Sequence, residues 1–243
     1  MNSLIVIPSR LASTRLPNKP LADIAGLPMI VQCLKRAEES KSGPVIVAAG
    51  DQEIVEAIEA HGGTAIMTDP DLPSGSDRVW AAVEAYDPDE KYDVIINVQG
   101  DLPTLDPHVI AATAEPLKNA AVDISTAVAE ITEEDEKTNP NVVKAYLAFK
   151  QGSHTARALT FTRATAPFGE GPLYHHIGLY GYRRDALKQF VSMPPGLLEQ
   201  REKLEQLRAL EVGMRIDATL VKTVPLGVDT PEDLEKARQL LAG

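Results

Sequence analysis

The first half of this chain alternates apolar, β-rich runs with amphipathic helical patterns, and few folds accommodate that order. The runs that read as strands cover residues 4–9, 44–50, 64–68 and 93–100. The segments with helical spacing follow them, at residues 29–40, 51–62, 76–87 and 107–119. Because the strand runs are apolar throughout, we expect helices on both faces of the sheet. The pattern predicts an α/β fold with a doubly wound, mainly parallel, Rossmann-like sheet, whose ligands bind beyond the carboxyl ends of the strands.

The second half mixes strands and helices less regularly, which predicts a small β-rich lobe beside the completed sheet. We expect strands at residues 123–131, 142–149, 156–162, 175–182 and 218–226, and helices at 186–193, 201–213 and 230–243. In the last helix, Thr230 is the expected N-cap, Pro231 the first residue and Asp233 the partner in a near capping box. No Gly/Ser-rich linker or internal repeat divides the 243 residues, so we predict a single domain.

The N-terminal sequence MNSLIVIPSR has no basic segment before its short apolar run, so we expect a buried strand there and not a signal peptide. No apolar stretch approaches the roughly 20 residues that a membrane span needs. Because Cys33 is the single cysteine, an internal disulfide and a cysteine-based zinc site are excluded. These features predict a soluble, cytoplasmic protein without membrane insertion.

The charge balance argues against a general nucleic-acid surface. The chain has 35 acidic and 24 basic residues, a net charge of -11, whereas nucleic-acid backbones are held mainly by Lys and Arg. An anionic ligand would therefore need a local basic pocket.

The loop after the first strand, PSRLASTRLPNKPL, is the strongest candidate for that pocket. It places Arg10, Arg15 and Lys19 together with hydroxyl side chains that include Ser13, directly after a buried strand. Such a group of cations and hydroxyls suits a triphosphate. The loop matches neither the Walker A pattern nor the G-x-G-x-x-G turn. The alternative interpretation is a solvated basic loop.

Two carboxylates follow later strands. The run at 93–100 leads into Gln99 and Asp101, and the strand that we expect at KTVPLGV leads into Asp229. Carboxylates of this kind are hard oxygen ligands suited to Mg²⁺, and together they could hold it on a phosphate and an attacking hydroxyl. Asp229 could instead serve only as a helix-entry residue beside Thr230.

The segment SGSDR offers a second candidate contact for a nucleotide. Ser74 lies at the start of an expected helix and Arg78 one turn inside it, so they could bind a ribose or a phosphate. A capped helix with a surface arginine explains the same residues equally well.

Candidate acceptor-binding residues lie in the second half. Arg163 follows a strand and suits a carboxylate. In YHHIGLYGYR, the alternation places His176 and Tyr182 on one strand face, where core packing is the alternative. Glu205 and Gln206 are neighbours on an expected helix and could bind sugar hydroxyls or form ordinary helix surface.

Eight segments, taken in order, resemble the 3-deoxy-manno-octulosonate cytidylyltransferase family, also called CMP-Kdo synthetases. They are PSRLASTRLPNKPL, SGSDR, VQGDLP, NPNVVK, RATAPF, HHIGLYGYR, LEQLRALE and GVDTPEDL, and they extend over nearly the whole chain. The first loop and the QGD tip are similar across nucleotidyltransferases, whereas HHIGLYGYR, LEQLR and GVDTPEDL are typical of the Kdo branch.

The resemblance implies that CTP and 3-deoxy-D-manno-octulosonate (Kdo) react to give CMP-Kdo and diphosphate, which activates Kdo for lipopolysaccharide biosynthesis. It implies Mg²⁺ as cofactor, CTP and Kdo as partners, and a homodimer. It also implies a nucleotide-binding half at about residues 1–120 and a sugar-binding and dimerisation half at about 121–243. In such an in-line transfer, catalysis depends mainly on positioning of the reactants and neutralisation of charge, and no side-chain general base is required.

The residue assignments follow from the patterns above and the resemblance together. We assign nucleotide binding to Arg10, Ser13, Arg15, Lys19, Ser74, Arg78 and Gln99. We assign sugar binding to Arg163, His176, Tyr182, Glu205 and Gln206, metal binding to Asp101 and Asp229, and catalysis to Lys19, Asp101 and Asp229.

The chain departs from the family pattern at Asn18, where Gly is usual, at Leu102, where Glu is frequent, and at Phe168, where Trp is common. Asn tolerates the left-handed backbone better than most residues, so we expect the first departure to have a small effect. Two alternative functions stay open: the same transfer to a related acid sugar, such as 8-amino Kdo, a sialic or a pseudaminic acid, and a non-catalytic nucleotide-binding regulator.

Overall fold

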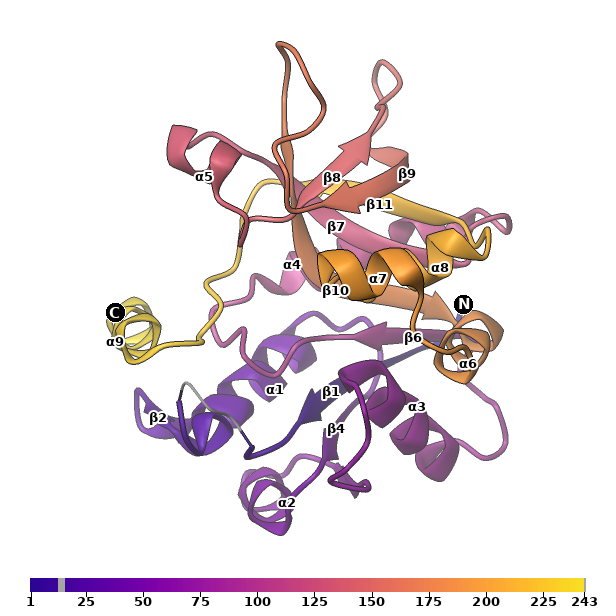
Figure 1. Cartoon of the computed structure of the whole chain (residues 1–243). Coiled ribbons are helices and arrows are strands. Elements are labelled where there is room, and N and C mark those ends of the chain that lie inside the picture. The colour runs from indigo at the N-terminus through magenta and orange to yellow at the C-terminus, as the bar shows by residue number, and fades with distance from the viewer. Residues whose placement is uncertain (13–15, 243) are drawn as a thin grey trace. The chain divides into compact units, whose positions relative to one another are not determined.

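The computed structural model (Figure 1) describes residues 1–12 and 16–242 of the chain. The chain divides into two compact units, one formed by residues 1–111 and 225–243 and the other by residues 112–224. The C-terminal segment thus belongs with the first half of the chain, so the boundary of the units differs from the division near residue 120 that the sequence suggested. The functional roles of the two halves stay predictions.

The first unit contains the predicted parallel sheet. Its strands are β1 (Ser3–Ser9), β4 (Val45–Ala49), β5 (Ala65–Met67) and β6 (Val94–Asn97), in the order β5-β4-β1-β6. All three neighbouring pairs are parallel. Chain order along the sheet therefore reverses between β1 and β6, and this switch point is where open α/β sheets bind ligands.

The remaining elements of this unit cover the sheet and its edges (Figure 1). They are α1 (Met29–Glu39), α2 (Gln52–Glu59), α3 (Gly75–Tyr86), α9 (Pro231–Leu241), the short helix η1 (Lys19–Leu21) and the hairpin strands β2 (Asp23–Ile24) and β3 (Leu27–Pro28). The α1 helix buries Ile30, Leu34 and Cys33. Residues Leu4 to Ile7 of β1 have no exposed surface, as expected of a strand covered on both faces.

The boundaries of two helices confirm the capping analysis. The Thr230 side chain accepts a hydrogen bond from the Asp233 backbone and forms a capping box at the start of α9. The Arg238 side chain of that helix donates to the Asp23 carbonyl at 2.9 Å, which attaches α9 to the β2 strand. Asn18 has φ 55° and ψ 28°, so the position where Gly is usual in the family uses the left-handed backbone that Asn tolerates.

The second unit contains a mixed sheet in the order β10-β7-β11-β9-β8. Its strands are β7 (Ile124–Glu130), β8 (Lys144–Leu147), β9 (Thr155–Thr162), β10 (Tyr174–Arg183) and β11 (Ile216–Val221). Only β7 and β11 are parallel to each other. The β8 strand also pairs with the start of β10, at Tyr174 and His175.

The helices of this unit are α5 (Glu134–Thr138), α6 (Arg184–Ser192), α7 (Leu197–Glu202) and α8 (Leu207–Glu211), while α4 (Pro107–Ala114) and η2 (Glu115–Lys118) connect the units along the chain. Together these elements confirm an α/β fold. Among the described residues, we find no helix with the length and apolarity to span a membrane.

Two predicted elements differ from the structure. The predicted helix at 201–213 is divided, because Lys203 adopts the left-handed conformation with φ 57° and ends α7. The predicted strand at 218–226 ends at Val221. Pro225 has no backbone N–H to donate to a neighbouring strand, so the segment that leads to Asp229 is a connection outside the sheet.

A buried ion pair joins the helices of the second unit. The Arg208 guanidinium donates to both oxygens of Glu199, at 2.8 and 2.7 Å, and to the Met193 carbonyl at 3.1 Å. Its carbon atom lies 4.8 Å from the centre of the Phe190 ring. This single side chain therefore connects α6, α7 and α8.

We expect Arg208→Ala to lower the free energy of unfolding by about 3 kcal/mol, because it leaves the Glu199 carboxylate buried without its partner. Urea unfolding checks this value. Arg201→Ala, which removes an exposed arginine from α7, is the matched control. Equal losses in both variants would contradict the role of the ion pair.

Candidate functional site

The loops that follow β1 and β6 meet at the switch point of the first unit. Glycines permit their close approach: a Cβ atom on Gly100 would lie 2.9 Å from the Pro8 carbonyl oxygen. A Cβ atom on Gly50, after β4, would lie 2.8 Å from an Arg78 nitrogen. Real side chains are not found at such distances, so glycine is required at position 100, where the neighbour is backbone, whereas at position 50 the Arg78 side chain would have to shift. The loops that carry the predicted site residues therefore lie close together.

Lys19 brings the two predicted aspartates together. Its Nζ atom lies 2.9 Å from Asp101 Oδ2 and 3.1 Å from Asp229 Oδ1. The backbones of these segments are also joined, since the Val228 N–H donates to the Asp101 carbonyl at 3.0 Å. Three positions that are far apart in sequence thus form one cluster in the first unit.

The two carboxylates keep Lys19 charged. Burial by itself lowers the pKa of Lys19, but the opposing effects of Asp101 and then Asp229 raise it above its ordinary value. The Lys19 ammonium group therefore stays positively charged, at the start of η1 in the segment that follows β1.

The same carboxylates provide the kind of donors that a divalent cation needs. Asp101 and Asp229 converge on one cation and offer hard oxygen atoms, which fit Mg²⁺. Across residues 1–12 and 16–242, no group of three or more His, Cys, Asp and Glu side chains could hold a metal. A Mg²⁺ ion would therefore need a ligand's phosphates and water to complete its shell, as is usual for this ion.

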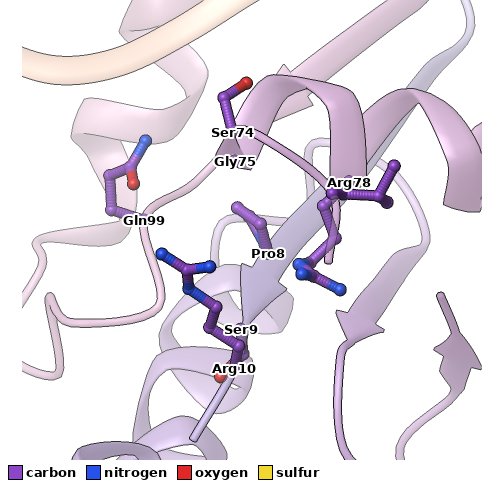
Figure 2. Close-up of a pocket in the computed structure, with 8 residues that line it drawn as sticks. Pro8, Ser9, Arg10, Ser74, Gly75, Arg78 and Gln99 are labelled. Carbon is purple, nitrogen blue, oxygen red and sulfur yellow. The ribbon is translucent and has the colours of Figure 1, made fainter. Parts of the chain in front are cut away.

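A pocket of about 170 Å³ lies within the first unit, and Gln99, two residues before Asp101, is part of its lining. Figure 2 shows Arg10 extending from the end of β1 toward Gln99, while the Arg78 side chain extends from α3. The lining residues come from the ends of β1 and β6 and from the start of α3: Pro8, Ser9, Arg10, Leu72, Ser74, Gly75, Arg78 and Gln99. Four of the predicted nucleotide-binding residues thus line one pocket.

Ser74 and Arg78 also have structural partners. The Ser74 side chain caps α3, since it accepts from the Asp77 N–H at 3.2 Å and donates to the Asp77 carboxylate at 2.6 Å. Buried Arg78 donates to Thr68 Oγ1 at 2.6 Å, and to the carbonyls of Asp69 and Pro70 at 3.0 and 3.1 Å. These contacts stabilise the wall of the pocket, and the capped-helix interpretation holds for Ser74 in this structure.

Sequence reasoning missed Asp51. Its Oδ2 accepts from the Leu11 N–H at 2.7 Å, so it attaches the first loop to the start of α2. The signal was the position of an aspartate directly after a buried strand and before a helix. Ser13 and Arg15, which we assigned to the nucleotide, lie outside the described residues.

In the second unit, Arg163 is attached to the C-terminal end of α7. Its guanidinium donates to the carbonyls of Glu202 at 2.7 Å, Pro140 at 2.9 Å and Lys203 at 3.3 Å. A cation is favourable at a helix C-terminus, where carbonyls lack partners. Arg163 therefore stabilises the turn that precedes Glu205 and Gln206.

His176 and Gln206 are in contact, as a shared ligand would require. Gln206 Nε2 lies 3.4 Å from His176 Nδ1, and both residues are buried. Burial, and then the neighbouring His175, lower the pKa of His176 to about 3. Gln206 is not on a helix as predicted but is the N-cap residue of α8, in the turn that also contains Glu205.

The aromatic residues near His176 form part of the core. Tyr182 is only 2% exposed, and its ring lies 5.8 Å from Tyr180 and 5.9 Å from Phe190. The ring of Tyr180 lies 5.5 Å from His176. Phe168, which stands where Trp is common in the family, differs, since its side chain is fully exposed. Of the predicted acceptor residues, Tyr182 thus has the clearest packing role.

Comparison with known proteins gives consistent matches over the full chain. Residues 4–216 match the sequence model of a family described as cytidylyltransferase. The 3-deoxy-manno-octulosonate cytidylyltransferase of Paramagnetospirillum magneticum is 61% identical over 241 residues, which cover 99% of this chain and 98% of that protein. The protein of that name from Parvibaculum lavamentivorans is 66% identical over 239 residues, with coverages of 98% and 92%.

Solved structures agree. A CMP:2-keto-3-deoxy-manno-octonic acid synthetase complexed with CTP has a TM-score of 0.92 and 36% identity, and the match covers 100% of this chain and 99% of that one. A nucleotidyl transferase from Methanothermobacter thermautotroptrophicus has a TM-score of 0.60 at 15% identity, with coverages of 98% and 97%. The second likeness concerns the fold alone.

The lowered pKa of His176 predicts a pH-dependent loss of stability. An unfolded histidine has a pKa of about 6.5, so the unfolded chain gains a proton below that pH while folded His176 stays neutral until about pH 3. Stability from this residue is therefore complete above about pH 6.5 and is lost as the pH falls.

Between pH 7.5 and pH 5, we expect the free energy of unfolding of the wild-type chain to fall by about 2 kcal/mol more than that of His176→Gln. The reason is that pH 5 lies about 1.5 pH units below the pKa of an unfolded histidine, and each unit corresponds to about 1.4 kcal/mol. Urea unfolding at several pH values measures the difference. His175 is present in both proteins, so its own titration cancels. Parallel pH profiles would contradict the burial of a neutral His176.

Proposed function

Because this chain belongs to the 3-deoxy-manno-octulosonate cytidylyltransferase family, we propose that it transfers CMP from CTP to Kdo and releases diphosphate. The product, CMP-Kdo, is the activated sugar for lipopolysaccharide biosynthesis. The observation that carries the proposal is the cluster of Lys19, Asp101 and Asp229, which lies in the same unit as a pocket lined by Arg10 and Gln99 at the ends of β1 and β6. That arrangement suits a nucleoside triphosphate.

The nucleotide binds to the first unit. The exposed Arg10 side chain neutralises phosphate charge, and Gln99 provides an amide that can recognise a base or a ribose. The start of α3 at Gly75 also lines the pocket, and helix N-termini favour anions. We assign Ser13 and Arg15 to the same ligand from the sequence pattern.

Asp101 and Asp229 hold Mg²⁺ in this proposal. When bound, the ion neutralises phosphate charge and favours ionisation of the acceptor hydroxyl. Lys19 already lies between both carboxylates, and its permanent charge can support the diphosphate leaving group. The chain's own contribution is to keep these charges in place before the ligand arrives.

At the α-phosphorus, the transfer forms one bond to oxygen and breaks another. The anomeric hydroxyl oxygen of Kdo bonds to the α-phosphorus, the bond from that phosphorus to the bridging oxygen breaks, and the hydroxyl proton is released. His176 is a poor general base, because a group with a pKa of about 3 accepts a proton weakly. The second unit therefore contributes binding and orientation.

Kdo binds to the second unit through the residues that we assigned from the sequence. Arg163 donates to backbone carbonyls and offers further N–H groups for the sugar carboxylate. His176 and Gln206 provide a neutral, polar contact for sugar hydroxyls, with Glu205 in the same turn. Tyr182 supports this site from the core.

We also propose a homodimer that works in the cytoplasm. The second unit exposes large apolar side chains, and exposed apolar surface is typical of protein interfaces. They include Leu159 on β9, Leu197 and Leu198 on α7, and Val212 after α8. The absence of any cysteine besides Cys33 agrees with a reducing compartment.

Diphosphate release from CTP tests the proposal. The purified chain is assayed with Mg²⁺ and Kdo, 8-amino Kdo, sialic acid or no sugar, and with EDTA as a control. Release that requires both Kdo and Mg²⁺ would establish the reaction. Release only with another acid sugar would change the substrate, and no release with any sugar would favour a nucleotide-binding regulator.

We expect Asp101→Ala to lower kcat by about 100-fold or more, because it removes a metal ligand and a partner of Lys19. Steady-state diphosphate release measures the change. Glu84→Ala, which removes an exposed carboxylate from α3, is the control and should leave kcat unchanged. Near-normal turnover of Asp101→Ala would remove Asp101 from the mechanism.

A further inference from the structure

An irregularity in β10 lies directly beside His176. Ile177 pairs with Ala127 of β7, but the next partner position, Thr126, pairs with Tyr180. Gly178 and Leu179 are thus inserted between two consecutive partner positions. Because the insertion has an even number of residues, His176 and Tyr180 stay on the same face as Thr126. A bulge of this kind redirects side chains next to a functional site.

The buried Thr126 hydroxyl occupies the inner side of this bulge. Its Oγ1 lies 2.7 Å from the Leu179 carbonyl oxygen, 3.1 Å from the Ile177 carbonyl oxygen and 3.0 Å from His176 Nε2. A hydroxyl has one proton, and two carbonyls can only accept it. The shorter distance assigns the proton to Leu179, so the oxygen is left to accept from His176.

This assignment determines which ring nitrogen of His176 carries the proton. Nε2 must be the donor to Thr126, because the Thr126 proton is engaged with Leu179. Nδ1 is then the acceptor, and the nitrogen that faces it is the Gln206 amide, 3.4 Å away. The hydrogen bonds run in one direction, from Gln206 through His176 and Thr126 to the backbone.

The ring itself has little freedom. His176 is 8% exposed, and its ring centre lies 4.7 Å from that of Phe161 and 5.5 Å from that of Tyr180. Its low pKa agrees with a neutral imidazole whose Nδ1 lone pair is not taken by a proton. The distance of 3.4 Å to Gln206 is long for a hydrogen bond, so this lone pair can accept from a better donor.

We propose that Thr126 is a positioning residue, which through the β10 bulge keeps His176 in the Nε2–H tautomer and presents Nδ1 as an acceptor for a hydroxyl group of the acid sugar. The inference rests on the proposed function, in which His176 and Gln206 bind that sugar. The inference deepens the proposed function, because a neutral acceptor nitrogen attracts a hydroxyl group and disfavours a carboxylate. The sugar's carboxylate is therefore left to Arg163.

The experiment compares Thr126→Val, which keeps the shape of the side chain without its hydroxyl, with Thr126→Ser, which keeps the hydroxyl. Ser125→Ala is the matched control, because Ser125 is also a buried hydroxyl on β7 that donates to a β10 carbonyl, Gly181, at 3.3 Å. For each protein, KM is measured for Kdo and for CTP. Nitrogen-15 NMR of the imidazole rings reports the tautomer, with His176→Gln identifying the signal.

We expect the wild type to show the Nε2–H tautomer. Thr126→Val should raise the KM for Kdo about tenfold, leave the KM for CTP within twofold and redistribute the tautomers. Thr126→Ser should restore both properties, and Ser125→Ala should change neither. An unchanged tautomer and unchanged KM for Kdo in Thr126→Val would overturn the proposal.

Two further outcomes are decisive without that variant. An Nδ1–H tautomer in the wild type would overturn the proposal even if Thr126→Val failed to fold. If the wild type showed the Nε2–H tautomer but released no diphosphate with any sugar, the proposed function would fail while the role of Thr126 toward His176 stood. The NMR and kinetic measurements thus separate the two failures.

Discussion

The first unit depends on one positive charge between two negative ones. Lys19 follows β1, Asp101 follows β6 and Asp229 precedes α9, and the ammonium group within 3.1 Å of both carboxylates keeps these segments together. Without the cation, the two carboxylates would repel each other, and the C-terminal segment would keep only its other contacts, such as the hydrogen bond from Val228 to the Asp101 carbonyl. Because the same charges can receive a triphosphate and a divalent cation, the interaction that completes this unit also prepares it for its ligand. Structure and proposed chemistry therefore use the same three side chains.

The residues around the pocket also combine a structural role with a proposed role in ligand binding. Ser74 caps α3 and Arg78 stabilises residues 68–70 through three hydrogen bonds, yet both side chains line the pocket. Glycines at positions 50 and 100 allow backbone and arginine to approach more closely than any Cβ would permit. A site built in this way is organised before the ligand binds, which reduces the cost of ordering side chains during binding. This agrees with a mechanism based on positioning and charge neutralisation.

The candidate site of the second unit differs from that of the first, because several of its polar groups are buried. A neutral His176, the Thr126 hydroxyl and the Gln206 amide form a chain of contacts in a largely buried region. Buried networks of this type are favourable only when donors and acceptors match, so the direction of each hydrogen bond is constrained by the backbone carbonyls at the bulge. The result is a defined acceptor atom. By contrast, Arg163 and Arg208 use their charge on helix ends and on Glu199, which stabilises the short helices around that network.

The sequence by itself determined the alternation of strands and helices, the Rossmann-like first sheet and the capped start of α9, because these depend on local patterns of apolar residues and caps. It also identified the family and predicted that Lys19, Asp101 and Asp229 belong to one site, although the strand expected before Asp229 ends at Val221. Other features were decided by tertiary structure. The left-handed Lys203 ended a helix that periodicity had extended, β11 ended at Val221 although the apolar pattern continued, and the C-terminal segment joined the first unit. Asp51 had a local signal in its place before a helix, but its contact with Leu11 and the contact of Thr126 with His176 join residues about 40 and 50 positions apart in sequence. Contacts over such separations arise only when the chain has folded, and no local pattern encodes them.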